Sequence, residues 1–274
     1  MIIDSHQHFW KYAPATHSWI SDDMNVLKRD FLPGDFETIA RSKGIAGTVA
    51  VQADQSEDET DFLLSLAKKS EFIKGVVGWV DLRAANLDTS LKKYSAEKLL
   101  KGFRHVVQAE PPGFLLDPRF IEGVNKLSEY GFTYDLLIYH HQLEEALKFA
   151  AKTSGVRIVV DHIAKPSIRT GEKTHWELNL AALATFKNVH CKLSGMVTEA
   201  RWNDWTYADI EPFIDEVFES FGPQRIMYGS DWPVCLVAGS YDDQFSVVEN
   251  YISRLSESEK RNVLSENAKR FYNL

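Results

Sequence analysis

Short runs of β-branched and aromatic residues alternate along the chain with longer amphipathic stretches. A short apolar run bounded by polar residues predicts a buried strand, whereas apolar residues spaced three or four apart predict a helix with one buried face. The predicted strands are the following runs: Met1–His8, Ile45–Ala53, Gly75–Asp81, Gly102–Val107, Thr133–Tyr139, Val156–His162, Val189–Ser194 and Arg225–Asp231.

The amphipathic stretches between these runs predict helices. Phe120, Val124 and Leu127 show the spacing of a single buried stripe. Near the end of the chain, Ser256 and Glu259 have the spacing of a capping box, which predicts a helix that continues to about Phe271. Further predicted helices include Asp58–Lys69, Asp117–Tyr130, Gln142–Thr153, Glu177–Phe186 and Tyr207–Phe221.

Strands that alternate with helices indicate βαβ units and a parallel sheet. Eight such units in about 250 residues match a (β/α)8 barrel of the α/β class. The rival is a doubly wound open sheet, which usually has a glycine-rich turn after its first strand, where this chain reads His6-Gln-His-Phe9. No linker, repeat or charge block divides the sequence, so we expect one barrel domain over residues 1–274.

Composition narrows the classes of partner. The 274 residues include 31 Lys and Arg against 39 Asp and Glu, a formal net charge of −8. An acidic chain without a basic stripe is not expected to bind nucleic acid or an anionic membrane surface. No signal peptide is visible, and two cysteines are too few for a disulfide framework, so we expect a cytoplasmic protein with reduced thiols and a small-molecule substrate.

Two histidines close the first predicted strand. Because strand side chains alternate faces, His6 and His8 point the same way, about 6.5–7 Å apart along the strand. Two imidazoles that face one cavity can form half of a metal site, or they can donate hydrogen bonds to an anionic oxygen. Histidines unrelated to function also fall at this spacing, so the pair alone leaves three interpretations open.

Two further strands end in residues of the same kind. His162 follows the sixth strand, where a lone histidine is more often structural, and Asp231 follows the eighth, where an Asp can instead cap the next turn. Barrel enzymes carry their catalytic groups at the C-terminal ends of the strands. Three histidines and one carboxylate at the ends of three separate strands therefore predict a single shared site.

Five separated motifs, in order along the chain, resemble the amidohydrolase superfamily, and within it the amidohydrolase-2 group of sugar-acid and related lactonases. The resemblance covers the whole chain and implies an amidohydrolase-like barrel, hydrolysis of a sugar-acid lactone such as L-fuconolactone, and one divalent metal, such as zinc, on His6, His8 and Asp231. Members that work without metal imply an alternative in which the histidines act as hydrogen-bond donors. The motifs are Asp4-Ser-His-Gln-His-Phe-Trp10, Asp161-His-Ile-Ala-Lys-Pro166, Lys192-Leu-Ser-Gly195, Gly229-Ser-Asp-Trp-Pro233 and Asn267-Ala-Lys-Arg-Phe-Tyr272.

The fourth strand departs from the family pattern. Many members have a carboxylated Lys or a Glu there that bridges two metals, whereas this chain has Arg104. A binuclear site is therefore not expected, and Arg104 becomes a candidate catalytic donor beside His162. After the fifth strand, either His140 or His141 takes the place of the family's fifth-strand ligand, or neither does, and His140 is the preferred candidate.

Lactone hydrolysis needs an activated water, a stabilised oxyanion and a protonated leaving alkoxide. Asp231 is the expected general base, with a pKa raised by desolvation, and it then passes the proton to the ring oxygen. A bound metal, or the donors His6, His8, His162 and Arg104, would polarise the carbonyl.

Candidate substrate contacts lie beside the strand ends. Gln52 can hydrogen-bond sugar hydroxyls and Trp79 can cover the apolar face of a sugar, although a loop amide and a core aromatic are equally good interpretations. Lys192 after the seventh strand is as readily an exposed lysine, and Trp202 and Trp205 lie in a loop that can form a lid. The remaining candidates are Tyr139, His140 and Trp232.

Other functions stay open on the sequence. The chain lacks a Gly-x-Ser-x-Gly nucleophile motif, which argues against a serine hydrolase. The alternatives are a nonoxidative decarboxylase of an aromatic acid, a hydrolase of a non-sugar lactone such as 2-pyrone-4,6-dicarboxylate, and a non-catalytic sugar-binding barrel. Barrels of the resembling kind often pair, so a homodimer is compatible with all of them.

Overall fold

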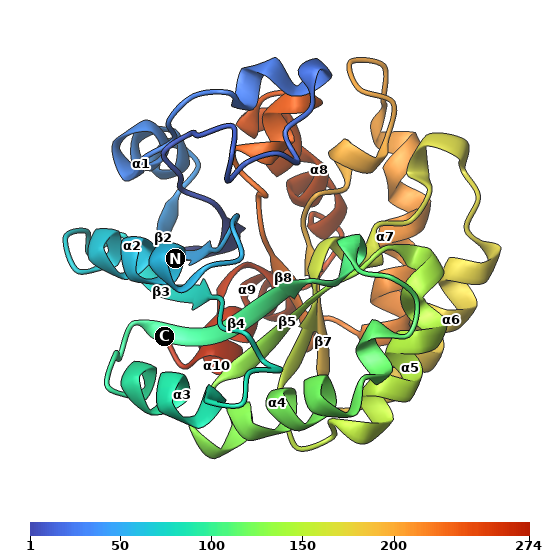
Figure 1. The fold of residues 1–274 in the computed structure, drawn as a ribbon. Helices are drawn as coiled ribbons and strands as arrows, with labels where there is room; N and C mark the ends of the chain where they lie inside the picture. The colour runs from blue at the N-terminus through green and yellow to red at the C-terminus, as the bar shows by residue number, and fades with distance from the viewer.

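The computed structural model describes residues 1–274 and confirms the predicted (β/α)8 barrel (Figure 1). Eight parallel strands are hydrogen-bonded in chain order. Between the eighth strand and the first, the His8 amide donates to the Trp232 carbonyl at 2.7 Å and the Asp231 amide donates to the His6 carbonyl at 2.8 Å, which nearly closes the barrel. The strands are β1 (Ile2–Gln7), β2 (Ile45–Val51), β3 (Ile73–Gly78), β4 (Leu100–Val106), β5 (Thr133–Leu137), β6 (Ile158–Val160), β7 (Val189–Leu193) and β8 (Ile226–Tyr228).

Helices form the outer layer around the strands (Figure 1). The predicted helix Tyr207–Phe221 is observed with those bounds, and the other predicted helices begin or end within three residues of the observed ones. The helices are α1 (Pro33–Ser42), α2 (Glu57–Ala67), α3 (Leu87–Ser95), α4 (Pro118–Glu129), α5 (Leu143–Lys152), α6 (Thr174–Ala184), α7 (Tyr207–Phe221), α8 (Tyr241–Ile252), α9 (Glu257–Arg261) and α10 (Asn267–Tyr272).

The predicted capping box starts the C-terminal helical segment. The Ser256 amide donates to the Glu259 carboxylate at 2.9 Å, and the Glu259 amide donates to the Ser256 hydroxyl at 3.4 Å. The segment then passes through a π-helical turn, Asn262–Glu266, before α10. This turn separates α9 from α10, where the sequence predicted one continuous helix.

Apolar side chains pack in two places. The larger core fills the space between the strands and the surrounding helices. The smaller one lies inside the barrel, where residues such as Val49 and Val51 meet Phe271 and Tyr272 of α10. Arg157, just before β6, donates to the Phe271 carbonyl, which places α10 at the N-terminal ends of the strands. The opposite end of the barrel is therefore the one that carries the cavity.

None of the helices has the length and the apolar composition needed to cross a membrane. Cys191 and Cys235 are both buried, and neither forms a disulfide.

Candidate active site

The four side chains at the ends of three predicted strands, His6, His8, His162 and Asp231, lie together at the C-terminal end of the barrel. The Asp231 carboxylate is 3.4 Å from His8 Nε2 and 3.8 Å from both His6 Nε2 and His162 Nε2. The imidazoles of His6 and His8 approach each other to 3.1 Å between their Nε2 atoms. All four residues are buried.

Backbone strain is concentrated at this cluster. Four successive residues after β6, His162 to Lys165, have φ values between 46° and 60°, and Asp231 has φ 57°. A left-handed conformation costs a non-glycine residue about 1–2 kcal/mol, and such strain persists where the surrounding structure enforces it, often at functional sites. The turn directs His162 toward Asp231 and Lys165 into the adjacent cavity. No residue of this turn is a Gly or Asn, so a left-handed backbone could not be predicted here from residue type.

Two glycines of the family motifs make room for the histidines. A Cβ atom on Gly195 would lie 2.5 Å from Nδ1 of His162, and one on Gly229 would lie 2.7 Å from Cβ of His6. Gly195 also has φ 61°, which favours glycine at that position. Any larger side chain at either position would displace an imidazole of the cluster.

Hydrogen bonds on the outer side of the rings orient two of the imidazoles. His8 Nδ1 donates to the Val51 carbonyl at 2.8 Å, so its Nε2 atom carries a lone pair that faces Asp231. His162 Nδ1 is 2.9 Å from the Ser194 hydroxyl. In this tautomer, His8 accepts a hydrogen bond or binds a metal through Nε2.

A buried network of charges lies behind His6. Lys192 Nζ is 2.5 Å from an Asp135 oxygen, 3.0 Å from Asp161 Oδ1 and 3.1 Å from His6 Nδ1. The Tyr272 hydroxyl donates to Asp135 at 2.8 Å. Lys192 is fully buried, which overturns its interpretation as an exposed lysine. Sequence reasoning missed Asp135, although a lone Asp inside an apolar strand is a signal that could have found it.

Arg104 is held rigidly at the edge of the cluster. Its guanidinium is 3.2 Å from Asp161 and donates to the Gln52 side-chain oxygen at 2.9 Å and to the Gln52 carbonyl. Gln52 is fully buried and does not line the cavity. The structure therefore corrects the expectation of a substrate contact at Gln52, because its amide is taken up in positioning Arg104.

The pKa of Asp231 is displaced in the direction opposite to the one expected. Burial alone would raise it, but His162, His8 and His6 around the carboxylate outweigh burial and hold the pKa below its usual range. Burial lowers the pKa of His162 to about 4, and it also lowers the pKa values of His6 and His8. At neutral pH the site therefore holds one carboxylate among three neutral imidazoles.

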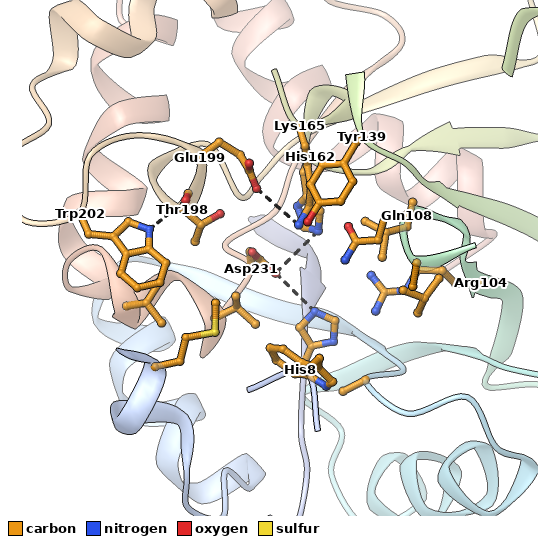
Figure 2. Close-up of a pocket in the computed structure, with 18 residues that line it drawn as sticks. His8, Arg104, Gln108, Tyr139, His162, Lys165, Thr198, Glu199, Trp202 and Asp231 are labelled. Carbon is orange, nitrogen blue, oxygen red and sulfur yellow. Dashed lines mark hydrogen bonds and ion pairs between the residues drawn. The ribbon is translucent and has the colours of Figure 1, made fainter. Parts of the chain in front are cut away.

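A cavity of about 420 Å³ opens above the cluster (Figure 2). Asp231, His8, His162 and Arg104 reach its surface, whereas His6 lies beneath it. This volume lies within the range of small-molecule sites. The other lining residues are Trp19, Met24, Ala53, Val106, Gln108, Ala109, Leu137, Tyr139, Lys165, Thr198, Glu199, Trp202, Val234 and Val237.

Of the other predicted substrate contacts, only Tyr139 lines this cavity. The ring of Trp232 is buried and stacks on Phe36 at 4.7 Å between centroids, which corrects its expected contact with substrate. The half-buried Trp79 donates from its indole to His105 Nδ1 at 3.2 Å, and it is not among the residues that line the cavity. His140 supports the strained turn, since its Nδ1 donates to the Lys165 carbonyl at 2.9 Å.

The donor atoms of His6, His8 and Asp231 suit one divalent metal. They all lie within 4.8 Å of one another, with separations of 3.1, 3.4 and 3.8 Å. Ligand atoms around a tetrahedral zinc with bonds of about 2.0–2.1 Å lie about 3.3 Å apart. The Arg104 guanidinium, 3.4 Å from His6 Nε2, places a permanent positive charge beside this set and disfavours a second cation.

The family model for amidohydrolases matches residues 3–274. The chain belongs to this amidohydrolase family. Among its amidohydrolase relatives, a Burkholderia multivorans protein named L-fucono-1,5-lactonase is 41% identical over 99% of this chain and 96% of its own length. A Burkholderia ambifaria protein of the same name is 34% identical over 88% of this chain and 83% of its own length.

A solved amidohydrolase structure from Burkholderia multivorans, with bound zinc, superposes on this chain with a TM-score of 0.97. The two are 40% identical, and the match covers 100% of this chain and 99% of that one. These matches confirm the predicted family and barrel, and they make the chain an enzyme of the hydrolase class.

Proposed function

We propose that this amidohydrolase opens the ring of a sugar-acid lactone, such as L-fucono-1,5-lactone, to the aldonic acid. The observation that carries the proposal is the Asp231 carboxylate, which lies within 3.4–3.8 Å of three imidazoles on the surface of a cavity of small-molecule size. The relatives named as fuconolactonases support the sugar-acid substrate class.

Asp231 is suited to act as the general base. Its carboxylate reaches the cavity, where it can accept a hydrogen bond from a water molecule and take the proton as the water oxygen attacks the carbonyl carbon. Positioned general-base catalysis contributes about 10²–10⁴-fold to a rate. A low pKa makes this carboxylate a weak base but keeps it ionised, so its main contribution is to orient the water and to stabilise the positive charge that develops on it.

Arg104 and His162 are suited to stabilise the carbonyl oxygen as it becomes negative. Both line the cavity beside Asp231, and the bonds from Asp161 and Gln52 hold the guanidinium in place before substrate binds. Donors that are already oriented stabilise a developing oxyanion without reorganisation. His8 does not belong with these donors, because the tautomer set by Val51 leaves a lone pair on its cavity-facing nitrogen.

His6, His8 and Asp231 would hold a divalent metal when one is bound, and that metal would supply Lewis-acid polarisation of the lactone carbonyl. The remaining steps use this chain's own groups. As the ring C–O bond breaks, the proton taken by Asp231 passes to the alkoxide, which becomes the hydroxyl group of the ring-opened acid. The new carboxylic acid then releases a proton to solvent.

The named relatives favour lactone hydrolysis over the decarboxylase alternative, because two of them are called L-fucono-1,5-lactonase. A non-catalytic sugar-binding barrel does not account for the strained backbone at both His162 and Asp231. The proposal includes a cytoplasmic location, which suits two buried cysteines without a disulfide.

A substrate screen tests the proposal directly. Purified protein is incubated with a panel of aldonolactones, with 2-pyrone-4,6-dicarboxylate and with aromatic acids, while a pH indicator reports acid release and absorbance reports loss of the aromatic acid. We expect acid release from sugar-acid lactones. Activity confined to the pyrone or to the aromatic acids would contradict the proposal.

A further inference from the structure

Lys165 and Glu199 form an ion pair on the cavity wall beside the catalytic cluster. Their side chains approach to 3.4 Å and are 17% and 21% exposed, and both line the cavity. Figure 2 shows Glu199 across Asp231 from Arg104, with Lys165 between them beside His162. The pair therefore faces whatever part of a substrate extends beyond the lactone carbonyl.

The backbone on both sides holds the pair in place. Lys165 is the last residue of the strained turn after β6, and its carbonyl accepts a hydrogen bond from His140. Glu199 ends a short 3₁₀ turn, Val197–Glu199, that follows β7, and the neighbouring Thr198 hydroxyl donates to the Gly195 carbonyl at 2.7 Å. Neighbouring strands thus present one cation and one anion at fixed positions.

The pair has unused hydrogen-bonding capacity. Lys165 Nζ and the Glu199 carboxylate have no other hydrogen-bond or ion-pair partner in the protein, and the ammonium also lies 5.4 Å from the centre of the Tyr139 ring. A lysine ammonium has three donors, and a carboxylate has about four acceptor sites. Most of these donor and acceptor sites are free to bind a ligand. A substrate hydroxyl group can accept a hydrogen bond from Lys165 while it donates one to Glu199.

We propose that Lys165 and Glu199 form a clamp for the hydroxyl groups of the substrate, and that this clamp selects neutral polyhydroxylated lactones. The inference rests on the lactonase function proposed above. Tyr139 and Trp202, which also line the cavity, offer apolar ring surface for the C–H groups of a sugar.

The balance of charge in the cavity supports a neutral substrate. Arg104 and Lys165 are the cations that line it, and Glu199 and Asp231 are the anions. Each cation is already paired with a carboxylate, through Asp161 and Glu199. A substrate carboxylate near the clamp would meet Glu199 and Asp231 without an unpaired cation, and such repulsion selects against acidic lactones.

Two conservative variants, Glu199→Gln and Lys165→Met, test the clamp. The ligands are L-fucono-1,5-lactone, δ-valerolactone, which has the same six-membered ring ester but no hydroxyls, and L-fucose, which has hydroxyls but no lactone carbonyl. The matched controls are Glu177→Gln and Lys173→Met, which alter an ion pair of similar length, 3.5 Å, outside the cavity.

We expect each clamp variant to raise KM for the sugar lactone and to weaken L-fucose binding, measured by calorimetry, by about ten- to a hundredfold, as for the loss of a hydrogen bond to a charged group. The rate constant kcat should change less than KM. Hydrolysis of δ-valerolactone should change less than threefold, and the control variants should match wild type. Thermal unfolding verifies that each variant is folded.

Three results would overturn the clamp. The first is that both clamp variants bind L-fucose as tightly as the control variants do and have the same KM for the sugar lactone. The second is an equal loss of activity on both lactones, which would mean that the variants disturb the catalytic cluster. The third is wild-type protein that hydrolyses δ-valerolactone as efficiently as the sugar lactone. Failure of the proposed function is distinguishable, because wild type would then hydrolyse no sugar lactone while L-fucose binding still reports on the clamp.

Discussion

Lys192 Nζ lies 3.1 Å from His6 Nδ1, on the side of the imidazole that faces away from the cavity. The same ammonium pairs with Asp135 and Asp161, and Arg104 also pairs with Asp161, so two cations balance two buried carboxylates behind a histidine of the site. A charge this deep is stabilising only while its partners are present. The contact therefore couples the stability of the barrel interior to the geometry of the site.

Removal of that ammonium should strongly destabilise the protein. In Lys192→Met, Asp135 and Asp161 lose their shared cation, and breaking a buried pair in this way costs about 3–5 kcal/mol. The free energy of unfolding from urea titration measures the loss. Lys187→Met, an exposed lysine before β7, is the control and should change stability by less than about 0.5 kcal/mol. Equal free energies of unfolding for the two variants would show that the Lys192 network does not stabilise the protein by this amount.

A methyl group at Gly195 should impair activity more than stability. In Gly195→Ala the new Cβ would lie 2.5 Å from His162 Nδ1, so the imidazole must leave its position beside Asp231. Gly171→Ala is a close control, because Gly171 has a similar φ of 73° but no atom within 4 Å of the new Cβ. Both variants should lose about 1 kcal/mol of stability from backbone strain. Only Gly195→Ala should lose lactonase activity, and equal activity in the two would contradict the proposed placement of His162.

Half-buried His190 should make stability depend on pH below neutrality. Burial lowers its pKa to about 4, whereas the unfolded value is about 6.5, so the unfolded state binds more protons between these values. Stability from this group is complete above about pH 6.5 and falls as pH drops toward 4, by about 2 kcal/mol between pH 7 and pH 5. In His190→Gln that fall should be smaller by this amount, whereas exposed His175→Gln should behave as wild type. Parallel pH profiles for all three proteins would rule out the effect.

Metal content should reflect a single site. We expect protein loaded with zinc and then desalted to retain about one zinc per chain by elemental analysis, because His6, His8 and Asp231 supply one ligand set. His8→Ala should lose most of this zinc, while His141→Ala, an exposed histidine next to the cavity-lining Tyr139, should retain it. Two zinc ions per chain, or full retention in His8→Ala, would contradict a mononuclear site on these residues.

The sequence predicted the barrel and the cluster of His6, His8, His162 and Asp231 because both depend on local periodicity. Strand spacing decides which face a side chain occupies, and parallel strands bring their C-terminal ends to one edge. Trp232 shows where this reasoning stops. Trp232 follows Asp231 directly in the chain. The left-handed backbone at Asp231 changes the direction of the chain, so the Trp232 ring packs in the core and not in the cavity.

Local periodicity could not predict the roles of Lys192, Gln52 and Glu199, for a different reason. Each depends on a partner far away in the sequence: Lys192 on Asp135, Gln52 on Arg104, and Glu199 on Lys165. The pKa of Asp231 is displaced downward because three imidazoles surround it, and the number of neighbours around a carboxylate is set by the tertiary structure.

The most direct test of the account compares wild type with Asp231→Asn on L-fucono-1,5-lactone, with acid release measured by a pH indicator. Wild type should hydrolyse the lactone, and the variant should lose about 10²–10⁴-fold in kcat while its thermal unfolding shows an intact fold. The isosteric amide retains the shape of the side chain but can neither carry the negative charge nor take a proton from water. Turnover by a folded Asp231→Asn protein at a rate near that of wild type would contradict the central role given to this carboxylate.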